Sequence, residues 1–204
     1  MPLLTPQPRE AIHTRAIEIN GYRRRDGLND IEAHLSGAKS FEQTNYDRGF
    51  IPRGEPIQDM WLRVTIDDTM QIVDAYAVSD KTPYVICPQA AVNFSRLVGL
   101  QTKTGFLRDA NQRVGGTLGC THLRELLQHM ATKAFQIINP TKVRQEMREK
   151  GADDAPGSDN TGARITEKMG GPPKILNTCL AYADNGPLVK RRWPKLYMGQ
   201  DAAD

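Results

Sequence analysis

The sequence predicts an α+β domain in which an antiparallel meander of about four strands carries helices packed on one face. Three observations indicate this class. Apolar and polar residues alternate in several segments within residues 12–78, as they do in half-buried strands. Apolar residues then recur at helical spacing over residues 88–138. Strands that precede the helices, rather than alternating with them, favour a sheet whose helices lie on one side.

The first two strands are expected at residues 12–22 and 28–40, joined by residues 23–27. Asp26 and Gly27 tolerate the positive φ of a tight hairpin, so the joint is expected to be a turn, with the exact register left open. The second strand then has one apolar and one ionisable face. Its apolar residues are Ile31, Ala33 and Leu35, and its ionisable residues are Asp30, Glu32 and His34.

Two further strands complete the meander. The third has Met60, Leu62, Val64 and Ile66 on one face. Asp67 and Asp68 form the next turn, and residues 70–78 return as the fourth strand.

Helical patterns follow. Pro88 suits the start of a helix, which makes Cys87 the expected N-cap residue of a first helix. A short helix over residues 106–114 ends at Gly115-Gly116, and a third is expected from about Thr121 to Ile138. The residues expected to face inward are Ala90, Ala91, Phe94, Leu97 and Val98 in the first helix, and Leu123, Leu126, Leu127, Met130, Ala134 and Phe135 in the third.

The periodicity divides the chain into three regions. Residues 1–138 form the main α+β domain. Residues 139–174 are rich in Gly, Pro, Asp and Ser and are expected to be a mobile excursion or linker. Residues 175–204 are apolar enough again to dock on the main domain.

Composition excludes several classes of function. The net charge of +3 is small and the basic residues are scattered, so no nucleic-acid partner is expected. No apolar run approaches the ~20 residues that span a membrane, and no secretory signal is recognisable. Three widely spaced cysteines do not form a disulfide framework. These features predict a cytoplasmic protein, with homo-oligomerisation left open.

One candidate for chemistry is the start of the third helix, in the segment GGTLGCTHL. The unpaired N–H groups of a helix N-terminus stabilise an anion. We expect such groups beside Cys120, Thr121 and His122. A thiol in that position loses its proton more readily, so a catalytic role is one reading. A small buried hydrophobic residue and a metal or redox role are the alternatives.

A second candidate is the polar face of the first hairpin. With a two-residue turn, Arg23 faces Asp30, Gly21 faces Glu32 and Ile19 faces His34. Acids, bases and cations then lie within reach of one another, as general acid–base catalysis requires. The alternative is a solvated face with cross-strand ion pairs. The residues gathered on this side would be Arg15, Arg23, Asp30, Glu32 and His34.

The strings IHTRAIEINGYRRRDGLNDIEAHL, GGTLGCTHLRELLQHMATKAFQ and ILNTCLAYADNGPLVKRRWP resemble the bacterial domain-of-unknown-function family 2889. The likeness extends over most of the chain apart from residues 149–173. The family pattern has a histidine after the cysteine of the last string, where this chain has Leu180. No role for a histidine at that position is carried over.

The order of the elements also resembles the iron–sulfur cluster scaffold fold. That resemblance implies a metal site at Cys87 and Cys120, with Asp59 as a third ligand. The first scaffold cysteine has no counterpart near residues 55–59, and Gly119 stands where the scaffold has a histidine. A metal-binding or carrier protein is therefore the alternative reading, and a non-catalytic interaction module is another.

The family resemblance further implies a place in the breakdown of lignin-derived aromatic dimers, as a lyase that releases formaldehyde from a hydroxymethyl side chain. A small phenolic substrate is then the expected partner, without cofactor or metal, because no nucleotide or metal motif occurs in the sequence. The predicted catalytic residues are His13, Arg15, Glu32 and His34. The predicted substrate-binding residues are Tyr22, Arg23, Asp30, Cys120, Thr121 and His122.

Overall fold

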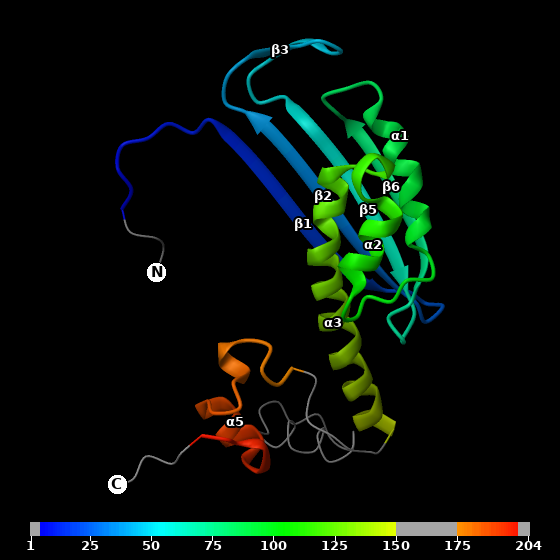
Figure 1. Cartoon of the computed structure of the whole chain (residues 1–204), viewed down its shortest axis with the longest axis vertical. Coiled ribbons are helices and arrows are strands. Elements are labelled where there is room, and N and C mark those ends of the chain that lie inside the picture. Colours follow the sequence, from blue (N-terminus) through cyan, green and yellow to red (C-terminus); the bar gives the residue numbers. More distant parts are fainter. Residues whose placement is uncertain (1–4, 150–174, 200–204) are drawn as a thin grey trace. The chain divides into compact units, whose positions relative to one another are not determined.

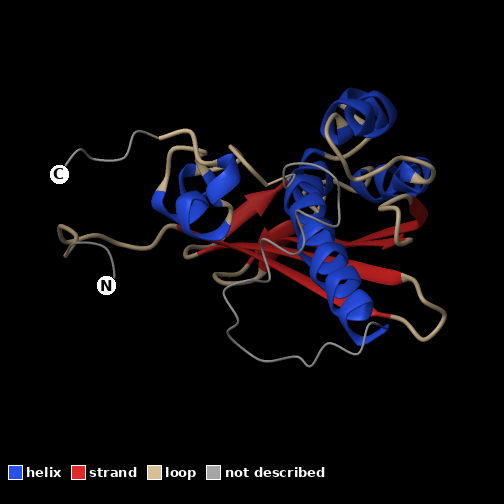
Figure 2. Cartoon of the chain, turned by 90° about the horizontal axis from the view of Figure 1, so that it is seen from below, coloured by secondary structure: helices blue, strands red, loops and turns tan. Residues whose placement is uncertain are grey.

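The computed structural model describes residues 5–149 and 175–199, and within the first range it describes side chains as far as residue 138. The chain forms two compact units, residues 1–140 and 141–204. In the first unit an antiparallel sheet carries helices on one face (Figures 1 and 2). The predicted α+β class is therefore confirmed.

The sheet has the strand order β1-β2-β5-β6, so consecutive long strands are neighbours and the predicted meander is confirmed. A two-stranded hairpin that the sequence did not lead us to expect, β3 and β4, is inserted between β2 and β5. The strands are β1 (His13–Arg23), β2 (Asn29–Lys39), β3 (Gln43–Asn45), β4 (Gly49–Ile51), β5 (Pro56–Ile66) and β6 (Ile72–Lys81).

The register of the first hairpin differs by one residue from the expected one. Tyr22, not Arg23, faces Asp30. The reason is the loop, which spans residues 24–28 and is closed by a hydrogen bond from Arg24 N to Leu28 O at 2.9 Å. Gly27 adopts a φ of 85° in this loop. Because side chains alternate along a strand, this shift moves every residue of β1 to the opposite side relative to β2.

The helices pack on one face of the sheet and close the core. Their apolar residues, such as Phe94 of η1, meet the side chains of β2, β5 and β6 that alternate inward, such as Leu35 and Met60. These three residues are all less than 2 % exposed. The elements are α1 (Cys87–Val92), η1 (Asn93–Leu97), α2 (Phe106–Val114), η2 (Gly116–Leu118) and α3 (Thr121–Glu149). The predicted stripe of the third helix is confirmed, with Leu123, Leu126, Leu127, Met130 and Ala134 buried and Phe135 packed against them.

Two details of the first helix differ from expectation. The N-cap residue is Ile86, and Cys87 is already helical, since proline is accommodated in the first turn. Val98 is 42 % exposed rather than inward, because the chain leaves the helical conformation there, with ψ at 135°.

The third helix is longer than its apolar periodicity suggested. It continues to Glu149, past the expected end at Ile138. The rest of the expected excursion, residues 150–174, lies outside the described residues. In the second unit the described segment contains η3 (Leu180–Tyr182), α5 (Pro187–Arg192) and η4 (Pro194–Leu196), with Val189 and Trp193 buried. The docking of residues 175–204 on the main domain stays a prediction.

Candidate functional site

The structure divides the predicted site residues between the two sides of the sheet. Ile17 and Ile19 of β1 pack against the core, so the β1 residues of the same parity, His13, Arg15 and Arg23, lie on the helix side. The other side, called the polar face below, carries Tyr22, Asp30, Glu32 and His34 from the predicted set, together with Asp59, Trp61, Arg63 and Thr65 of β5. The predicted row of Arg15 and Arg23 beside Asp30, Glu32 and His34 is therefore wrong.

The strongest acid–base geometry on the polar face centres on His34. Its Nε2 lies 2.7 Å from Asp59 Oδ1, and its ring stacks on Trp61 with centroids 3.9 Å apart and planes 8° from parallel. A carboxylate only accepts hydrogen bonds, so in the neutral imidazole Nε2 carries the proton and Nδ1 presents a lone pair. A histidine held in this way by a carboxylate can act as a general base.

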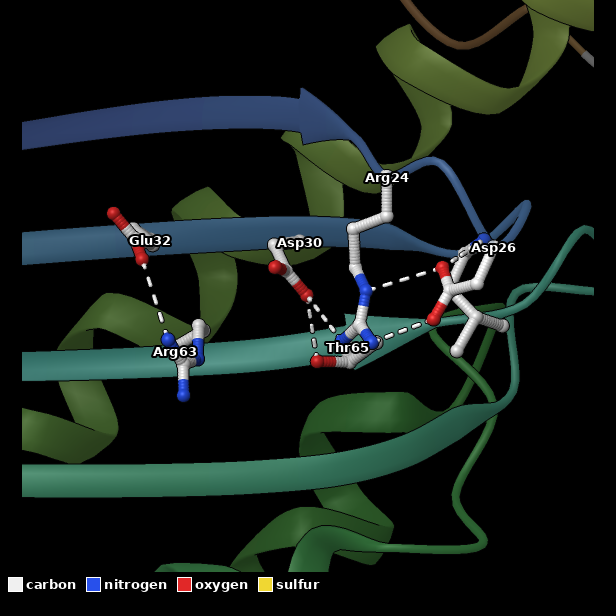
Figure 3. Close-up of polar contacts among 7 residues, drawn as sticks. Arg24, Asp26, Asp30, Glu32, Arg63 and Thr65 are labelled. Carbon is white, nitrogen blue, oxygen red and sulfur yellow. Dashed lines mark hydrogen bonds and ion pairs between the residues drawn. The ribbon is translucent and has the colours of Figure 1, made fainter.

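Asp30 occupies the hairpin end of the polar face. It accepts a hydrogen bond from Thr65 Oγ1 at 2.7 Å, and the Arg24 guanidinium lies 3.5 Å from the same oxygen. Figure 3 shows this guanidinium between the carboxylates of Asp26 and Asp30. The hydrogen bond from Arg24, followed by that from Leu28 N, lowers the pKa of the Asp26 carboxyl below its ordinary value. These contacts hold Asp30 as a structural acceptor at the turn.

Between these two sites lies a looser ion pair. Arg63 Nη1 is 3.8 Å from Glu32 Oε1, and the two side chains are 46 % and 37 % exposed (Figure 3). On β6, Tyr76 faces Arg63 and Val78 faces Trp61. The polar face therefore has charged groups over β2 and β5 and a strip of aromatic and apolar side chains over β5 and β6.

The helix side holds a separate group at the start of α3. Arg15 Nη2 pairs with Glu125 Oε2 at 2.5 Å, and Cys120 Sγ lies 3.9 Å from His122 Nδ1. Burial lowers the pKa of the His122 imidazole, and the positive charge of Arg15 lowers it further, while Glu125 opposes the shift. Cys120 directly precedes α3, and its carbonyl accepts a hydrogen bond from Arg124 N at 2.9 Å, as that of an N-cap residue does.

The remaining predicted residues stay apart from His34. Arg23 pairs with Asp68 at 2.8 Å, and Thr121 is exposed at the start of α3. His13 lies beside Gly37, since a Cβ added there would be 3.5 Å from His13 Nε2. The structure therefore brings together Tyr22, Asp30, Glu32 and His34 on one side of the sheet, and Arg15, Cys120 and His122 on the other.

The lyase reading implies a closed pocket around the acid–base residues, because ligand sites in proteins are concave. Two surface hollows in the described part of the chain have volumes of about 290 and 400 Å³, and neither is lined by His34, Asp59 or Trp61. The side chains of His34 and Asp59 are 26 % and 30 % exposed. The expected pocket is thus neither of these hollows, and water reaches the dyad along the polar face.

The predicted metal site requires Cys87, Cys120 and Asp59 to lie close together. Within residues 5–138 and 175–199, no three His, Cys, Asp or Glu side chains lie close enough together to hold a metal ion. Asp59 is directed to His34 on the polar face, whereas Cys120 packs against the core on the helix side. A site made of Cys87, Cys120 and Asp59 therefore has no basis in the described residues.

Two important residues were missed by sequence reasoning. Asp59 was considered only as a metal ligand, and Trp61 was not considered. The signal was present, because both alternate with the apolar Met60 and Leu62 and so share a face with one another. Adding the third strand to the hairpin would have placed them beside His34.

Fold and site together define a small α+β protein with acid–base and aromatic groups on the face of its sheet opposite α1, α2 and α3. The family model described as "Protein of unknown function (DUF2889)" matches residues 13–136, which include the whole sheet, α1, α2 and the first part of α3. The chain belongs to this family. No curated protein and no solved structure matches it. The likeness to the iron–sulfur scaffold fold stays a prediction.

The helices also bear on the question of a membrane span. In the part of the chain that the structure describes, each helix is too short or too polar to cross a bilayer.

Proposed function

We propose that the protein is a cofactor-independent lyase that acts on a lignin-derived phenolic dimer and releases formaldehyde from its hydroxymethyl side chain. The observation that carries this proposal is the His34–Asp59 pair stacked on Trp61. It combines a positioned base with an aromatic surface, which are the two elements that an acid–base reaction on a phenolic ring needs.

The base in this proposal is His34 Nδ1. Asp59 holds the ring in one tautomer through Nε2 and stabilises the imidazolium that forms when Nδ1 takes a proton. Among the described residues no hydrogen-bond partner of Nδ1 is found. This nitrogen is therefore available to a substrate hydroxyl.

The substrate ring is proposed to lie along the strip formed by Trp61, Val78 and Tyr76. Trp61 and Tyr76 are 43 % and 60 % exposed, so a second aromatic ring would remove apolar surface from water. Arg63 follows Trp61 on the same face of β5 and lies between Glu32 of β2 and Tyr76 of β6. Its guanidinium is placed to stabilise a phenolate oxygen of a ring bound there.

The proposed reaction starts when the phenol loses its proton and the oxygen substituent leaves the benzylic carbon with that proton as an alcohol, a phenol or water, which gives a quinone methide. His34 Nδ1 then takes the proton of the hydroxymethyl group. The carbon–carbon bond to that group breaks and formaldehyde leaves. The bonding electron pair enters the quinone methide, whose ring becomes a phenolate again, and the imidazolium returns its proton.

The proposal also includes the kind of substrate and the location of the protein in the cell. The substrate is a small phenolic molecule rather than nucleic acid, because Asp30, Glu32 and Asp59 place negative charge on the polar face, which repels phosphate. The cytoplasm is the proposed location, since the free thiols of Cys87, Cys120 and Cys179 fit a reducing compartment.

The test is formaldehyde release from a panel of phenolic dimers with hydroxymethyl side chains. His34→Gln should abolish release while the fold is retained, and His129→Gln is the matched control, since His129 is exposed on α3. If the wild-type protein releases formaldehyde and the His34→Gln variant releases it equally well, the assignment of His34 as the base is wrong. No release from any member of the panel would refute the lyase.

A non-catalytic interaction module is the second candidate. It is favoured by the partial exposure of the polar face, where Tyr22 is 49 % and Tyr76 60 % exposed. Under this interpretation, the Trp61→Ala variant should capture less of the partner than the wild-type protein does in a pull-down from a lysate of the source cell. Neither protein should form formaldehyde.

A further inference from the structure

The outer side of β6 is paired only at its beginning. Ile72 N donates to Leu100 O at 2.8 Å, and Gly99 N donates to Ile72 O at 2.8 Å. After Ile72, no strand in the described part of the chain pairs with this side of β6. β6 is therefore an edge strand for most of its length.

The unpaired groups of this edge follow from the pairing of Ile72. Val73 is an extra residue in the ladder, since Ile66 faces Ile72 whereas Thr65 faces Asp74. Beyond this bulge, the alternation of an antiparallel strand directs the N–H and C=O groups of Ala75, Ala77 and Ser79 away from β5. Such a row of unpaired donors and acceptors can pair with another strand.

A hollow of about 400 Å³ accompanies the edge. Its β6 wall includes the small side chains of Ala75, Ala77 and Ser79, and its other wall includes Ala91 and Val92 of α1. Val92 is 74 % exposed. The helix-side surface next to the edge is thus apolar and has room for a neighbouring side chain.

We propose that β6 pairs with β6 of a second copy of this chain around a two-fold axis at Ala77. A bulge supports this partner: Met60 faces Ser79, whereas Asp59 faces Lys81, so Lys81 takes the place in the ladder that residue 80 would have had. Asp74 and Lys81 consequently lie three ladder positions from Ala77 in opposite directions and on the same face.

The two-fold pairing matches unlike charges. Asp74 faces Lys81 of the second copy, Lys81 faces the second copy's Asp74, and Tyr76 faces its Val78, all at non-hydrogen-bonded positions of the new ladder. Charges that only protect an edge from pairing need no such symmetry. The uncharged residues 75–79 between them form the centre of the contact.

The test is sedimentation equilibrium of the full chain and of charge-reversed variants. The wild-type protein is expected to dimerise. Asp74→Lys and Lys81→Glu should each weaken dimerisation by about tenfold or more, because two attractive cross-strand pairs per dimer become repulsive. The double variant D74K/K81E should restore it, since each pair is again of unlike charge.

The control is Glu42→Lys, an exposed residue away from this edge, which changes the net charge as Asp74→Lys does. It should leave the dimer unchanged. A wild-type monomer at every soluble concentration would overturn the proposal, and so would a double variant that dimerises no better than the single ones. Because misfolding is not repaired by a second reversal, the double variant also separates a lost contact from a lost fold.

Discussion

Gly119, directly before Cys120, allows the backbone to pass close to the end of α2. A Cβ added there would lie 2.0 Å from the carbonyl oxygen of Val114 and 2.9 Å from its carbonyl carbon. Its φ of −147° suits any residue, so the obstacle to a side chain is this contact alone. Since backbone atoms cannot turn away as a side chain does, Gly119→Ala should lower the free energy of unfolding by about 3 kcal/mol, the upper part of the range for overpacking.

The assay is urea unfolding followed by circular dichroism, with two variants of the same turn for comparison. Thr117→Ala changes an exposed side chain and should stay within about 0.5 kcal/mol of the wild type. Gly116→Ala meets no atom within 4 Å but forces alanine to a φ of 56°, which costs about 1 kcal/mol. If Gly119→Ala is as stable as Thr117→Ala, the reasoning from the close backbone contact is wrong.

Three further predictions concern the polar groups. Thr65→Val keeps the shape of a side chain that is 1 % exposed but removes its hydrogen bond to Asp30, so urea unfolding should show a loss of about 1 kcal/mol, against almost none for the exposed Thr132→Val. Burial lowers the pKa of His122, so the unfolded chain binds more protons than the folded one. The stability from this residue is complete above the ordinary pKa of about 6.5 and is lost as pH falls toward the folded value; His122→Gln should therefore reduce the loss of stability on acidification. Asp59→Asn should lower kcat with little change in KM, because an amide can hold His34 in the wrong tautomer; an unchanged kcat would exclude the proposed role of the carboxylate.

Alternation along the strands predicted the fold because it follows directly from burial. Ile31, Ala33 and Leu35 are all nearly inaccessible, as their spacing indicates. The register was not predictable in the same way. Asp26-Gly27 suits both a two-residue turn and the longer loop that is observed, and a difference of one residue reverses the side on which Arg15 lies.

The candidate site was predicted only in part for the same reason. His34 was recognised from its own strand, but its partners Asp59 and Trp61 come from β5, and pairing between β2 and β5 is a long-range feature. The β3–β4 hairpin between them hides this pairing in the sequence. The end of α3 was set too early because the apolar stripe stops near Ile138, although a helix needs no such stripe to continue to Glu149.

The central claim is that a phenolic substrate binds beside Trp61 and His34, and the indole N–H signals test it directly. The chain has two tryptophans, Trp61 on the polar face and the buried Trp193 in the second unit. In a titration with a phenolic dimer that the protein cleaves, followed by ¹H–¹⁵N NMR, the Trp61 indole signal should shift and the Trp193 signal should stay in place. A cleaved dimer that leaves the Trp61 signal unmoved would contradict the account.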